Sequence, residues 1–156
     1  MSAGRSGRLR LVRQHFGVLH EIVASEAGAV VKTIGDAVMA TFSTPDRALA
    51  AALRMREAMT RINAERGNED LLLKIGIHEG PCLAVRLNNS QDYFGQTVNI
   101  AARVQGLAST RAIFVTQPVV EDPSTAKILQ SQSLHPSMRR AALRGIADET
   151  TVYEIP

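Results

Sequence analysis

The stretch VVKTIGDAV, residues 30–38, places a glycine between two mainly apolar runs. The β-branched residues before the glycine and the segment AVMATF after it predict a β-hairpin, in which Gly35 supplies the permissive backbone. Lys32 and Asp36 flank the turn, so both side chains can emerge near one end of the hairpin. They form either a surface ion pair or part of a ligand site, since a charge against apolar strands needs a partner.

Helices are predicted on both sides of this hairpin. Residues 9–26 place apolar side chains on one helical face, which indicates an amphipathic helix. A second helix is predicted to begin after Thr44 as its cap, with Pro45 at the first position and Asp46 at the positive end of the dipole. It should run to about Arg66, with its apolar face formed by Leu49, Ala52, Leu53, the stem of Arg56, Met59 and Ile62.

The rest of the chain completes an α+β pattern of helices packed on one mainly antiparallel sheet. In order, the sequence predicts two strands within 71–87 with a bend near Gly80, a loop at 88–96, a helix at 97–108, a strand at 111–116, helix and loops at 117–137, and a closing hairpin from 139–145 and 150–155.

Composition limits the classes of protein that fit. The 156 residues suffice for a single domain, and 45% hydrophobic with 21% charged residues are ordinary for a globular protein. Aromatic residues make up only 4%, which argues against a nucleic-acid partner despite the net charge of +3. No apolar run is long enough to cross a membrane and no signal peptide is recognisable, so we expect a cytoplasmic chain.

Cysteine and histidine usage indicates neither a disulfide nor a zinc site. Cys82 is the only cysteine and lies in an apolar run, as expected of a buried thiol. His15 and His20 do not share a helical face, and His78 and His135 have no companion ligands near them in the sequence.

A second polar group interrupts the apolar pattern in DYFGQTVNIAAR, residues 92–103. Asn99 and Arg103 are four residues apart on a predicted helix and therefore project from one face, while Asp92 precedes the helix. An acceptor, an amide and a fixed cation around a helix start suit a phosphorylated ligand with a polar base. The alternative is a helix with an exposed polar stripe.

Together these segments resemble the catalytic domain of the class III nucleotidyl cyclases, the adenylate and guanylate cyclases. The resemblance covers about residues 9–156 and rests on VVKTIGDAVMATF, LLLKIGIHEGPCLAV, DYFGQTVNIAARVQGLA and LRGIADETTVYEI, which follow the family's order and approximate spacing. It implies a ferredoxin-like cyclase fold and a head-to-tail homodimer that binds ATP or GTP between its subunits. A fused sensor or regulatory domain in the whole protein would also fit.

The resemblance also implies a role for each site residue. Lys32 and Asp92 would recognise the purine, Asp36 would hold catalytic Mg²⁺ or Mn²⁺, Asn99 would orient the ribose and Arg103 would stabilise the reacting phosphorus. Arg144 would contact the triphosphate, although the family usually has LKG where this chain has LRG.

The pair Lys32 and Asp92 favours ATP, because adenine offers an acceptor at N1 and a donor at its amino group, whereas guanine has the opposite polarity on that edge. The family's two metal ions are held by two aspartates, one of them on a first strand. No aspartate precedes Asp36 in this chain. We therefore expect the first strand to be absent and the 156-residue chain to be inactive.

Two other interpretations remain open at the level of the sequence. One is a cyclase-homology module that only dimerises or binds nucleotide to regulate a partner. The other is an unrelated ferredoxin-like interaction domain in which these polar residues coincide by chance.

Overall fold

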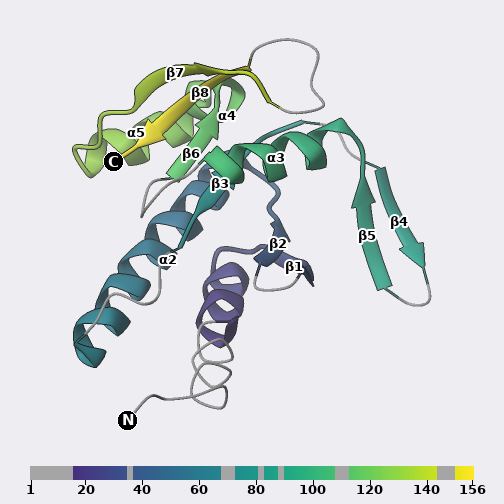
Figure 1. Ribbon diagram of the computed structural model, residues 1–156, viewed down its shortest axis with the longest axis horizontal. Helices are drawn as coiled ribbons and strands as arrows, with labels where there is room; N and C mark the ends of the chain where they lie inside the picture. Colours follow the sequence, from purple (N-terminus) through teal and green to yellow (C-terminus); the bar gives the residue numbers. More distant parts are fainter. Residues whose placement is uncertain are drawn as a thin grey trace.

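Figure 1 shows the computed structural model, which describes residues 16–34, 37–67, 73–80, 83–87, 90–107, 113–143 and 150–156. The elements, in chain order, are a helix at 16–25, β1 (Ala29–Ile34), β2 (Ala37–Thr41), α2 (Pro45–Arg66), β3 (Ile75–Ile77), β4 (Leu83–Leu87), β5 (Ser90–Phe94), α3 (Gln96–Leu107), β6 (Ile113–Thr116), α4 (Gln117–Glu121), α5 (Pro123–Ser131), β7 (Ser137–Ala141) and β8 (Thr150–Ile155).

The helix and hairpin predicted at the start of the chain are confirmed. The helix extends over 16–25 and buries Leu19, Ile22 and Val23, while residues 9–15 of the predicted helix lie outside the described residues. β1 and β2 pair in antiparallel fashion, and the pairing of Ile34 with Ala37 leaves only residues 35 and 36 between them. The sequence Gly35-Asp36 therefore connects the two strands, as the pattern predicts.

Helix α2 matches its predicted boundaries. Thr44 occupies the N-cap position with extended backbone angles, but its side chain makes no capping hydrogen bond, so only the position of the cap was predicted correctly. Pro45 opens the helix and Gly67, in a left-handed conformation with φ 73°, ends it. The predicted apolar face is buried at Leu49, Ala52, Leu53, Met59 and Ile62.

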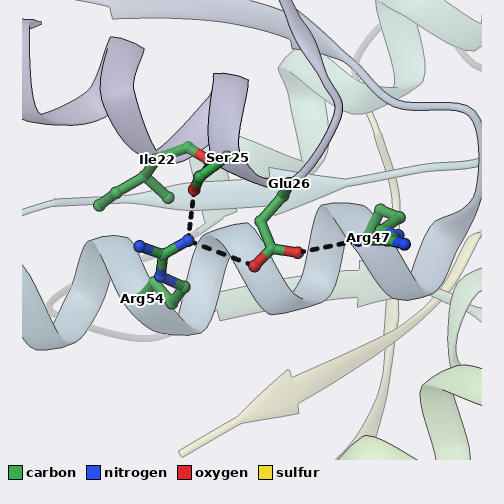
Figure 2. A network of polar contacts seen from close by, with 5 residues as sticks. All are labelled: Ile22, Ser25, Glu26, Arg47 and Arg54. Atoms are coloured by element: carbon green, nitrogen blue, oxygen red, sulfur yellow. Dashed lines mark hydrogen bonds and ion pairs between the residues drawn. The ribbon is translucent and has the colours of Figure 1, made fainter.

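Polar contacts tie the end of the first helix to α2 (Figure 2). The Glu26 carboxylate lies 3.3 Å from Nη1 of Arg54 and 3.7 Å from Nη1 of Arg47. Arg54 also donates to the Ser25 hydroxyl, which in turn donates to the carbonyl oxygen of Ile22 at 2.8 Å. One carboxylate thus bridges two arginines that lie about two helical turns apart.

The main sheet has the strand order β3-β6-β8-β7. β3 and β6 are parallel, whereas β6 with β8 and β8 with β7 are antiparallel, which confirms a mainly antiparallel α+β architecture. The predicted strand at 111–116, the helices within 117–137 and the closing hairpin are all present, although β7 begins at Ser137, two residues earlier than expected.

The two faces of this sheet carry separate apolar clusters. One face packs against α2, α4 and α5 and contains Ile77, Ile113, Val115 and Ile155 together with Leu49, Val119 and Leu129. The opposite face packs against α3 and contains Phe114, Val152 and Leu143 with Val104 of the helix. Alternate residues of β6 therefore point to opposite faces, as the strand period of two requires.

Two expectations from the sequence are wrong in detail. Residues 88–96 are not all loop, because Ser90–Phe94 forms β5, which pairs with β4 and places Asp92 opposite Val85. Pairing of Leu87 with Ser90 leaves the two asparagines at 88 and 89 between the strands, a connection typical of a hairpin. Within the described residues the strands also form three sheets rather than one, with β1-β2 and β4-β5 as separate pairs.

Candidate functional site

Helix α3 carries Asn99 and Arg103 on exposed positions one turn apart, as the sequence predicted. Gly95 links β5 to the helix with φ 134°, a conformation that L side chains rarely adopt. The backbone nitrogen of Asn99 donates to the carbonyl oxygen of Gly95 at 3.3 Å. Gly95, which follows β5 and its Asp92, thus defines where α3 starts. It thereby also sets the position of Asn99.

The strands that carry the other two site residues, Lys32 and Asp92, contact each other. β1, which carries Lys32, contacts β5, which carries Asp92, and β5 also contacts α3. Lys32 is half-buried and lies opposite Met39 in the hairpin. The structure thus brings together the elements that carry Lys32, Asp92, Asn99 and Arg103. Figure 1 shows that the β4-β5 hairpin of this region extends away from the main sheet.

Two candidates cannot be located. Asp36 and Arg144 lie outside the described residues, so the proposed metal ligand and triphosphate contact stay predictions. In the described part of the chain, no three histidine, cysteine, aspartate or glutamate side chains gather closely enough to hold a metal ion. Nor does any helix in that part have the length and apolar character to span a membrane.

The structure adds one polar contact that the sequence did not reveal. Nδ1 of His78, directly after β3, lies 2.6 Å from Oγ1 of Thr116, the last residue of β6. Thr116 is 1% exposed, and burial lowers the pKa of the half-buried His78 imidazole below 6.5. The sequence contains no signal for this contact, because the two residues are 38 positions apart.

The chain resembles known nucleotidyl cyclases over most of its length. The family model for the adenylate and guanylate cyclase catalytic domain matches residues 6–155. A protein of Anabaena cylindrica named adenylate cyclase is 27% identical over 161 residues, which cover 94% of this chain but only 32% of the relative. The chain therefore spans about a third of that relative's length.

Solved structures share the fold. The guanylyl cyclase Cya2 superposes with a TM-score of 0.81 at 18% identity, covering 94% of this chain and 79% of Cya2. The adenylyl cyclase CyaB from P. aeruginosa superposes with a TM-score of 0.76 at 17% identity, covering 100% of this chain and 84% of CyaB. With the family model matching nearly every residue, the chain belongs to the adenylate and guanylate cyclase catalytic domain family.

Proposed function

We propose that the chain is the catalytic domain of an adenylate cyclase, a phosphorus–oxygen lyase that converts ATP to 3′,5′-cyclic AMP and pyrophosphate. The observation that supports this proposal is the contact of β1 and β5, which carry Lys32 and Asp92, beside a helix that exposes Asn99 and Arg103. The relative from Anabaena cylindrica, named adenylate cyclase, agrees with it.

The choice of ATP over GTP follows from hydrogen-bond polarity. The ammonium of Lys32 can only donate, so it suits N1 of adenine, and the carboxylate of Asp92 can only accept, so it suits the 6-amino group. Guanine would present a donor and an acceptor in the reverse positions. A site that holds these two side chains should therefore discriminate strongly, because the wrong base leaves polar groups unpaired.

The reaction forms a bond between the ribose 3′ oxygen and the α-phosphorus while the bond from that phosphorus to the pyrophosphate oxygen breaks. The hydroxyl proton is lost and pyrophosphate carries away the electron pair. Asn99 would hold the ribose, and the guanidinium of Arg103 would stabilise charge that accumulates on the phosphorus oxygens. Divalent ions, when bound at Asp36, would neutralise phosphate charge and lower the pKa of the attacking hydroxyl.

The site is shared in a head-to-tail homodimer, with Asp36 of one subunit opposite Arg103 of the other. This arrangement explains why a single chain need not contain a complete site. A module that only dimerises or binds nucleotide is the second candidate, favoured by one observation: Asp36 is the first aspartate of the sequence, whereas a two-metal site needs a second carboxylate.

Nucleotide binding tests the base assignment on the chain as it stands. ATP should bind more tightly than GTP by calorimetric titration, and the double substitution Lys32→Glu with Asp92→Cys should reverse that order. Product analysis then separates the two candidates, because a binding module forms no cyclic nucleotide even in a chain extended at its N-terminus by an aspartate-bearing strand. Equal affinities of the unmodified chain for ATP and GTP would contradict the base assignment.

A further inference from the structure

Three polar side chains, His78, Thr116 and Thr97, lie near the ends of β3 and β6 and the first turn of α3, and the first two are hydrogen-bonded. β3 and β6 run parallel with Ile77 beside Val115, and both of these residues belong to the cluster on the α2 face. The next residue of each strand, His78 and Thr116, therefore points to the other face, the one that α3 covers. This placement agrees with the 2.6 Å contact between His78 Nδ1 and Thr116 Oγ1.

The second nitrogen of the same imidazole and the first turn of α3 both lie close to Gly80. A Cβ at Gly80 would lie 3.6 Å from Nε2 of His78 and 2.7 Å from Oγ1 of Thr97. The Gly80 backbone thus lies near both side chains, at a point where a Cβ would crowd the Thr97 hydroxyl. Thr97 belongs to the first turn of α3, two residues before Asn99.

The contact with Thr116 fixes the orientation of the ring. The Thr116 hydroxyl is buried and needs a hydrogen-bond partner, which Nδ1 of His78 supplies. With Nδ1 bound to Thr116 of β6, Nε2 lies near Gly80, whose position also adjoins the first turn of α3. The imidazole therefore bonds to the end of β6 and lies close to the residue that approaches the helix carrying Asn99 and Arg103.

We propose that His78 is a positioning residue of the nucleotide site, acting through Thr116 and the first turn of α3 to set the location of Asn99 and Arg103. This inference rests on the proposed function for its consequence in nucleotide binding. Its structural part, the coupling of β6 to the start of α3, rests on the His78–Thr116 bond and on the proximity of both His78 and Thr97 to Gly80.

Substitutions at Thr116 test the coupling with a matched pair. Thr116→Val keeps the shape of the side chain and removes the hydroxyl, whereas Thr116→Ser keeps the hydroxyl and removes a methyl group. In amide ¹H–¹⁵N spectra of the 156-residue chain, Thr116→Val should shift the signals of residues 97–103, and Thr116→Ser should leave them near their original positions. His78→Gln should shift the same signals. Combining it with Thr116→Val should add little further shift, because both substitutions remove the same hydrogen bond.

The consequence for the site is measured by ATP titration of the same proteins. Thr116→Val and His78→Gln should each weaken ATP binding by a factor on the order of 10, the value expected for one misplaced hydrogen-bonding group, and Thr116→Ser should retain the affinity. Thermal unfolding identifies any variant that fails to fold. If Thr116→Val does not fold, the ATP affinities of His78→Gln and Thr116→Ser are compared instead to test the positioning role.

The outcomes separate this inference from the proposed function. Failure of both the unmodified chain and its N-terminally extended form to bind ATP would refute the proposed function, while movement of the α3 amides would still support the positioning role. If the chain binds ATP and Thr116→Val binds it equally well, His78 does not position the site. Shifts confined to β3 and β6, with the α3 amides unmoved, would overturn the coupling itself.

Discussion

Gly76 of β3 lies directly beneath the backbone of Gln105 in α3, so close that a Cβ at position 76 would be 2.2 Å from the Gln105 nitrogen. Side-chain rotation cannot relieve such an overlap, because the opposing atoms belong to the helix backbone. The helix that carries Asn99 and Arg103 therefore rests on the sheet at a point where only glycine fits.

Substitution Gly76→Ala should push α3 away from β3 and destabilise the domain. Overpacking against a rigid backbone costs about 1–3 kcal/mol or more of unfolding free energy. Urea unfolding measures the loss. Gly106→Ala is the matched control on the same helix, since nothing lies within 4 Å of a Cβ there, and it should be neutral or stabilising through its better helix propensity. Equal effects of the two substitutions would contradict the close approach at Gly76.

The bridge formed by Glu26 predicts a salt-dependent contribution to stability. The Arg47 and Arg54 side chains are 53% and 49% exposed and Glu26 is 17% exposed, so solvent weakens both ion pairs. Glu26→Gln should lower the unfolding free energy by about 1 kcal/mol at low salt and by less at 1 M salt. Glu57→Gln, at an exposed position of α2, is the control and should change little. A loss that does not depend on salt would exclude the ion pairs as its cause.

Protonation of His78 should destabilise the folded chain. Burial lowers the pKa of this imidazole below its ordinary value of 6.5, so the unfolded state binds more protons between the lowered pKa and 6.5. Stability should therefore fall as the pH decreases through 6.5, and His78→Gln should flatten that part of the profile. Melting temperatures from pH 7.5 to 5.5 measure the difference, and His135→Gln, which removes an exposed imidazole, should leave the slope unchanged.

Local signals in the sequence were sufficient where one element determines its own shape. The β1-β2 hairpin follows from apolar runs around Gly35, and α2 follows from Pro45, a continuous apolar face and Gly67. The family match over residues 6–155 also excludes the alternative of an unrelated ferredoxin-like domain. Asn99 and Arg103 share a helical face because four residues separate them, whatever the tertiary structure.

The sequence was insufficient where polar residues obscured a strand and where a contact depends on distant strands. Polar residues around Asp92 suggested a loop, although this segment pairs with the neighbouring strand β4. The role of His78 could not be predicted because Thr116, its partner, is 38 residues away and adjoins it only through the parallel pairing of β3 with β6. The assembly of β3, β6 and β8 into one sheet likewise depends on long-range pairing, for which a local pattern gives no signal.

Loss of the Arg103 guanidinium should affect turnover far more than binding, because its proposed role is in the transition state. In the N-terminally extended chain, Arg103→Ala should lower turnover by a factor on the order of 100 or more with little change in ATP affinity. Mixing this variant with Asp36→Ala should recover activity, since one site of each heterodimer then keeps both residues. Dimers that form on mixing but remain inactive would contradict the shared site.

Strands β2 and β3 each have one edge without a partner strand among the described residues. Within the described residues β2 pairs only with β1, and β3, at the end of the main sheet, pairs only with β6. Unpaired backbone groups that become buried cost about 1–3 kcal/mol each, and open edges promote association. A first strand between these edges, as the resemblance to the cyclases implies, would satisfy them and supply the second aspartate.

We therefore expect the 156-residue chain to produce no measurable cyclic AMP with Mg²⁺ or Mn²⁺. The extended chain should assemble into a monodisperse dimer and should produce cyclic AMP. The decisive control is the same extension with its aspartate replaced by asparagine. That variant should recover the melting temperature and the dimer, because strand pairing uses only the backbone, but it should remain inactive, because two ions require two carboxylates. Rapid cyclic AMP formation by the 156-residue chain would show that Asp36 and the other residues of this chain suffice for catalysis.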